Sequence, residues 1–136
     1  MSNKTIKIGQ LDMELQSIFS AFEHHVHTAV DTAAEKTAEE AVKKLKKTSP
    51  KNKRAKRGKK YKNGWKYKKT SEGMTVYNEQ YQLTHLLENG HDIIINGEVR
   101  GHAAAHVHIA PVEAWAQDEF PEEFKRQVDK GCRLQM

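Results

Sequence analysis

The apolar residues near the N-terminus recur every three or four positions, which is the spacing of one helix face. They are Leu11, Leu15, Ile18, Phe22, Val26 and Val30. The pattern continues more weakly through a stretch rich in Ala, Glu and Lys as far as Leu45. Pro50 ends it, because proline disfavours helical geometry in the residue before it. We predict one long helix over residues 11–47, or two consecutive helices with a bend near His24 and His25.

The pattern changes to the period of strands after residue 63. Aromatic and basic residues alternate over 64–68, a turn sequence occupies 70–73, and 74–77 provides a returning strand. This alternation predicts a β-hairpin with one buried face. That face comprises Trp65, Tyr67, Val76 and Met74.

Three further elements follow the hairpin. Residues 81–89 predict a short helix that Gly90 closes, and residues 93–95 predict a strand ending in an Asn-Gly turn. Pro111 suits the first turn of a last helix, which Pro121 either splits or leaves intact. The order of elements predicts an α+β fold, organised as a single domain over residues 1–136.

The charge is distributed very unevenly. Residues 43–69 hold 15 of the 23 Lys and Arg residues and no Asp or Glu, so the remainder carries 8 basic and 18 acidic residues. Such a dense positive block resists burial and is either solvated or faces an anionic partner. We predict a flexible basic loop over 48–63, between the first helix and the hairpin. A solubilising role is the plainer interpretation, but this charge density favours contact with phosphates, without sequence readout.

Composition excludes several classes of protein. No apolar run approaches the roughly 18 residues of a membrane span, and the first residues contain no apolar signal core. The single cysteine, Cys132, excludes an intrachain disulfide framework. We therefore expect an intracellular or particle-borne protein that does not contact a membrane.

Candidate chemistry is sparse. His102, His106 and His108 stand near His85 and His91 and suggest a metal site, but no recognised ligand motif accompanies them. Cys132 has no general base beside it, Glu88 has no second carboxylate, and no phosphate-binding glycine loop is present. We predict no metal, no cofactor and no enzymatic activity.

Several short motifs occur together in a distinctive order. Thr48-Ser49-Pro50 precedes Gly58, Tyr61, Gly64 and Trp65, and residues 81–91 read YQLTHLLENGH. Arg100-Gly101, His108-Ile109 and Pro111 then lead into the last helix. Over residues 8–130 this combination resembles the head–tail joining proteins of long-tailed bacteriophages, a family of neck proteins and minor tail components.

The resemblance implies a structural subunit without an active site. Such a subunit joins a ring between the DNA-filled capsid and the tail, completing the connector so that the tail attaches and DNA passes. Its implied partners are copies of itself, the neighbouring head-closure or connector proteins and the tail-end proteins. Its implied location is the head–tail interface of the virion, after assembly in the host cytoplasm.

In this role the basic loop would face packaged double-stranded DNA or an acidic neighbouring protein. Its candidate contact residues are Lys51, Lys53, Arg54, Lys56, Arg57, Lys59, Lys60 and Tyr61. Within the leucine-rich motif, Glu88 and His91 are candidate subunit contacts with Arg100 of a neighbour. In the alternative, structural interpretation, Leu86 and Leu87 pack in the core, Gly90 caps a helix and Glu88 is solvated.

Two other functions compete with the neck assignment. The first is a small nucleic-acid-binding module that acts through the Lys- and Arg-rich segment 43–69. Its aromatic residues Tyr61, Trp65 and Tyr67 suit stacking on bases, although no known nucleic-acid-binding signature accompanies them. The second is a histidine-metal hydrolase, for which the sequence offers only the histidines.

Overall fold

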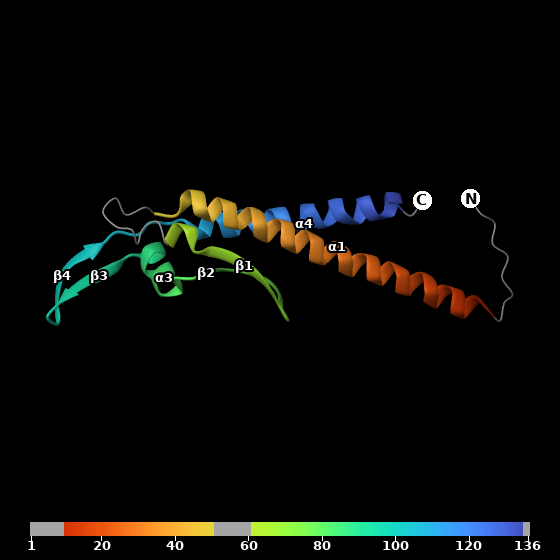
Figure 1. Cartoon of the computed structure of the whole chain (residues 1–136), viewed down its shortest axis with the longest axis horizontal. Coiled ribbons are helices and arrows are strands. Elements are labelled where there is room, and N and C mark those ends of the chain that lie inside the picture. Colours follow the sequence, from red (N-terminus) through yellow and green to blue (C-terminus); the bar gives the residue numbers. More distant parts are fainter. Residues whose placement is uncertain (1–9, 51–60, 135–136) are drawn as a thin grey trace.

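A single helix, α1 (Leu11–Thr48), runs along most of the molecule (Figure 1). It belongs to a computed structural model that describes residues 10–50 and 61–134. The helix has acidic residues in its first turn and Lys46 and Lys47 in its last, which complements the helix dipole. It passes His24 and His25 without interruption, so the predicted helix is confirmed and the alternative of two helices is wrong.

The last helix, α4 (Ile109–Leu134), lies beside α1 and runs in the opposite direction (Figure 1). Pro121 is exposed and stands inside α4 without splitting it. Contacts with α1 hold the helix on both sides of the proline. Lys44 Nζ lies 4.7 Å from the Trp115 ring, and His25 Nε2 lies 3.2 Å from the Val128 carbonyl oxygen.

Two separate antiparallel hairpins and a short helix come between α1 and α4 in the sequence. Strands β1 (Trp65–Thr70) and β2 (Gly73–Asn78) form the first hairpin, which confirms the prediction. Helix α3 (Tyr81–Asn89) follows, and β3 (His91–Ile95) and β4 (Glu98–Ala103) form the second hairpin. The predicted Asn-Gly turn joins β3 to β4, with positive φ at Asn96 and Gly97. The observed fold is therefore α+β, as predicted.

The core lies where the C-terminal half of α1 meets the first hairpin and the start of α4. Its buried residues are Ala41, Val42, Leu45, Tyr61, Trp65 and Val112, with Tyr67, Val76, Leu87, Ile109 and Trp115 packed around them. The predicted buried face of the hairpin is thus confirmed for Trp65, Tyr67 and Val76. Within residues 10–50 and 61–134, no helix combines the length and apolar character that crossing a membrane requires.

Candidate functional site: a buried joint at the base of the basic segment

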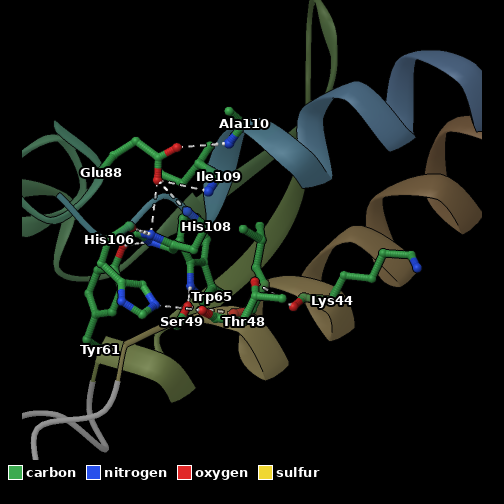
Figure 2. A network of polar contacts seen from close by, with 11 residues as sticks. Lys44, Thr48, Ser49, Tyr61, Trp65, Glu88, His106, His108, Ile109 and Ala110 are labelled. Carbon is green, nitrogen blue, oxygen red and sulfur yellow. Dashed lines mark hydrogen bonds and ion pairs between the residues drawn. The ribbon is translucent and has the colours of Figure 1, made fainter.

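A network of polar contacts gathers the residues on either side of segment 51–60 (Figure 2). We call this network the joint. It comprises Ser49, Tyr61, Trp65, Glu88, His106 and His108. The joint connects the end of α1, the first hairpin, α3 and the start of α4, which are far apart in sequence.

Glu88, near the end of α3, caps the N-terminus of α4. Its carboxylate accepts hydrogen bonds from the backbone N–H groups of His108, Ile109 and Ala110, at 2.8, 2.9 and 3.0 Å. The next residue, Pro111, has no N–H, so one carboxylate serves every donor at this helix start. Burial opposes ionisation of Glu88, but the three donors outweigh it and hold the pKa of its carboxyl group below the ordinary value.

The buried His108 ring links Glu88 to Tyr61. Its Nδ1 lies 2.7 Å from the His106 carbonyl oxygen and 3.0 Å from Glu88 Oε2, and both of these atoms can only accept a hydrogen bond. Nδ1 therefore carries a proton, and in the neutral ring Nε2 accepts the Tyr61 hydroxyl at 2.7 Å. Burial, followed by the charge of Glu88, raises the pKa of Tyr61 to about 12, so its phenol stays protonated at neutral pH.

Further contacts fix both ends of segment 51–60. Trp65 Nε1 donates to Ser49 Oγ at 2.7 Å, and the Ser49 hydroxyl donates to the Leu45 carbonyl at 2.5 Å. At the other end, the Asn78 side-chain amide donates to the Tyr61 carbonyl at 2.7 Å. The residues on either side of segment 51–60 are therefore both held in the joint.

The motif residues around Gly90 hold α3 against the chain that leads into α4. The Leu87 carbonyl accepts the His106 backbone N–H at 2.7 Å. Gly90 has a φ of +76°, and a Cβ on it would lie 2.7 Å from the Ala103 carbonyl oxygen. Glycine is therefore required here both for the positive φ and for the close approach of two backbones.

Glu88, His108 and Tyr61 are the residue types of an acid–base relay and are linked in series. Their burial, however, differs from that of a relay that meets a substrate. His108 and Tyr61 are only 1% and 2% exposed, and the Glu88 oxygens are occupied by backbone donors. Within the described residues, these groups are therefore largely shielded from solvent. Chemically, the arrangement stabilises a helix start and a chain crossing, and thereby positions the basic segment.

The predicted contact residues fall in different places. The seven basic residues from Lys51 to Lys60 lie outside the described residues. Tyr61, predicted alongside them, has its ring inside the core, at an edge-to-face angle of 72° to Trp65. Trp65 is also buried, which confirms its packing interpretation.

The three predicted subunit-contact residues are not brought together within one chain. Glu88 is not simply solvated, because its carboxylate is held in the joint. His91 has a buried Nδ1 for which the described residues supply no hydrogen-bond partner. Arg100 is exposed on β4 and lies 3.0 Å from Glu98. Contact of these residues with a neighbouring subunit stays a prediction.

The histidines of the metal hypothesis serve separate purposes. His108 belongs to the joint, His106 Nε2 lies 3.3 Å from the Thr48 carbonyl oxygen, and His102 Nδ1 lies 3.0 Å from Asp92. Among residues 10–50 and 61–134, no three His, Cys, Asp or Glu side chains are arranged to hold a metal ion.

Sequence reasoning missed Ser49 and His108 as partners in one site. It noted both residues within motifs, but nothing local predicts that His108 contacts a tyrosine 47 positions earlier. Pro111 could have indicated the site, because it marks a helix start. A helix start without its own capping side chain needs a hydrogen-bond acceptor from elsewhere. Glu88 is that acceptor.

Residues 14–90, more than half of the chain, match the family described as "Bacteriophage HK97-gp10, putative tail-component". The chain belongs to this family of phage tail components, and the predicted family is confirmed. The match contains α1 from residue 14 onward, the first hairpin and Glu88, whereas β3, β4 and α4 follow it. No curated protein and no solved structure matches the chain.

Proposed function

We propose that this tail component acts in the phage neck, as one subunit of a ring at the head–tail interface. The ring completes the connector, allows the tail to attach and lets DNA pass through its centre. The subunit works by shape and by self-association, not by catalysis. The observation that carries this proposal is family membership together with a joint whose only evident work is to position parts of the chain.

The joint supports a defined place for the basic segment within such a ring. Ser49 and Tyr61 fix its two ends on one side of the body. Copies arranged around a ring would therefore present their basic segments at equivalent positions. The seven Lys and Arg residues of each segment would produce a strong positive field that attracts phosphates without reading base sequence.

Within this proposal the basic segment faces packaged DNA or an acidic neighbouring protein. The contact residues are those predicted from sequence: Lys51, Lys53, Arg54, Lys56, Arg57, Lys59 and Lys60. Tyr61 anchors the segment to the body, since its hydroxyl is hydrogen-bonded to His108. The segment acts on the assembled particle and not on a free nucleic acid.

Complementation of a phage that lacks the gene tests this function against a nucleic-acid-binding module. The test variant replaces all seven basic residues from Lys51 to Lys60 with glutamine. The proposal predicts that this variant still forms rings and restores plaques, at reduced efficiency. A nucleic-acid-binding module that depends on these seven charges would give no plaques at all. Glu88→Ala in the same assay controls for a loss caused by a weakened joint.

A further inference from the structure

Two exposed apolar surfaces lie at opposite ends of the elongated molecule (Figure 1). The helix patch is the N-terminal part of α1, and the hairpin patch is the β3–β4 hairpin. The helix patch comprises Leu11, Leu15, Ile18, Phe19 and Phe22, and the hairpin patch comprises Ile93, Ile94, Ile95 and Val99.

The helix patch continues a stripe that is buried elsewhere in the same helix. Leu11, Leu15, Ile18 and Phe22 are spaced by four, three and four residues, so they share a face with Ala29 and Ala33. Those alanines are buried, between the contacts of His25 and Lys36 with α4. Towards its N-terminal end α1 diverges from α4 (Figure 1), and the same stripe is left uncovered by the described chain.

The uncovered area is large for a free monomer. Phe19 and Phe22 are 66% and 59% exposed, which leaves about 250 Å² of aromatic surface if each ring offers about 200 Å². With three further aliphatic side chains that are 40–56% exposed, the patch reaches the few hundred Å² at which an exposed apolar surface often marks a binding site.

The hairpin patch is also exposed to solvent in the described chain. Ile94 and Val99 are paired across the strands and are 64% and 63% exposed. A two-stranded hairpin is at best marginally stable alone in water. The register passes from Ile93–Gly101 to Ile94–Val99, which makes Arg100 the extra residue of a β-bulge. A bulge re-aims side chains, and here it leaves an exposed cation beside the patch.

We propose that the hairpin patch of one copy docks on the helix patch of the next copy. This proposal rests on the ring proposed above and identifies its subunit interface. A ring built from one chain requires two unlike surfaces on each subunit, because its contacts are head-to-tail. The two patches are unlike in shape, alike in apolar character and placed at opposite ends.

Charge also favours this pairing. Residues 11–35 contain five acidic side chains and no Lys or Arg. Asp12 and Glu23 both flank the helix patch, and the Glu23 side chain is 75% exposed. The predicted subunit contact of Arg100 therefore finds acidic partners on α1 of the neighbour, whereas Glu88 is engaged in its own chain.

Mixing two interface variants tests the proposal. Phe22→Asp disables the helix patch and Ile94→Asp disables the hairpin patch, so each variant alone is expected to be monomeric by light scattering. Mixed in equal amounts, they retain one good interface and should form a dimer of twice 15.6 kDa, but no ring. Met13→Asp, on the opposite face of the same helix, and Thr75→Asp, on the other hairpin, should still form rings.

Each other outcome has a definite meaning. Rings formed by either interface variant alone, or a mixture that stays monomeric, overturn the docking proposal while the ring function stands. A wild-type chain that forms no ring overturns the ring itself, and the docking with it. A dimer of Ile94→Asp alone would indicate that two helix patches meet symmetrically, which also contradicts the proposal.

Disulfide cross-linking tests the same interface without a charged substitution, so it remains informative if an aspartate variant fails to fold. In a Cys132→Ser background, Phe19→Cys and Ile94→Cys are purified separately and oxidised alone or mixed. The proposal predicts a disulfide-linked dimer only in the mixture. Cross-linking of either variant alone, or none in mixed rings, would contradict it.

Discussion

At the scale of single residues, Glu88 accepts more hydrogen bonds than any other side chain in the joint. Its carboxylate replaces the capping group that α4 lacks and also contacts His108. A charged acceptor that serves three donors at a helix start is costly to remove, because those donors would lose their partners.

Glu88→Ala is expected to lower the free energy of unfolding by about 2–3 kcal/mol, and Glu88→Gln by about 1 kcal/mol. Urea denaturation at neutral pH measures both values. Glu98→Gln, in an exposed ion pair, is the control and should change stability by less than about 0.5 kcal/mol. Equal effects at positions 88 and 98 would show that the cap is not formed.

The same residue predicts a dependence of stability on acid pH. Because the pKa of Glu88 is lower in the folded chain than its ordinary value of 4.5, the stabilisation is complete above that value. It is lost as pH falls through the folded-state pKa. The stability difference between the wild type and Glu88→Gln should therefore shrink as urea denaturation is repeated at pH values below 4.5. A difference that is constant with pH would contradict this.

Tyr61 predicts the opposite behaviour in alkali. Its pKa is raised to about 12, so its buried phenol stabilises the fold fully below the ordinary value of 10.0 and progressively less above it. In an absorbance titration, one of the four tyrosines should ionise near pH 12. Tyr61→Phe should remove that component, and its persistence in the variant would place the late-ionising tyrosine elsewhere.

At the scale of elements, α4 contains a proline, Pro121, that disfavours helical structure at its own position. Pro121 lacks the N–H that would complete the helical hydrogen bonds, yet α4 continues through it because α1 holds the helix on both sides. Helix propensity is outweighed here by packing between elements.

Replacing this proline with alanine should therefore stabilise the protein. Pro121→Ala is expected to raise the free energy of unfolding by about 1–3 kcal/mol, because alanine restores the missing N–H and relieves a clash. Thermal and urea unfolding measure the gain. Glu122→Ala, at the next exposed position, is the control and should be close to neutral. A loss of stability in Pro121→Ala would mean that the local helix geometry depends on the proline.

The elements were largely predictable from sequence, because their signals are local. The helical period from Leu11, the alternation from Trp65 and the Asn-Gly turn each lie within a few residues of the structure they predict. The joint was not predictable in this way. Glu88 and His108 meet through the crossing of α3 over the chain before α4, a contact between residues 20 positions apart. Periodicity describes one element at a time and does not show which elements meet.

At the scale of the whole molecule, the described residues form a long body with exposed apolar surface at both ends. The joint fixes the basic segment, and the two apolar patches offer surfaces for neighbouring copies. These features favour the proposed role as one subunit of an assembly. Membership of a phage tail-component family agrees with that view.

The most direct test of the neck function is electron microscopy of particles produced without this protein. Phage deleted for the gene, with a complemented control, would be induced and counted in negative stain. The neck function predicts DNA-filled heads and separate, complete tails, with joined particles restored by the wild-type gene. Normal joined and infectious particles in the deletion would contradict a role in head–tail joining.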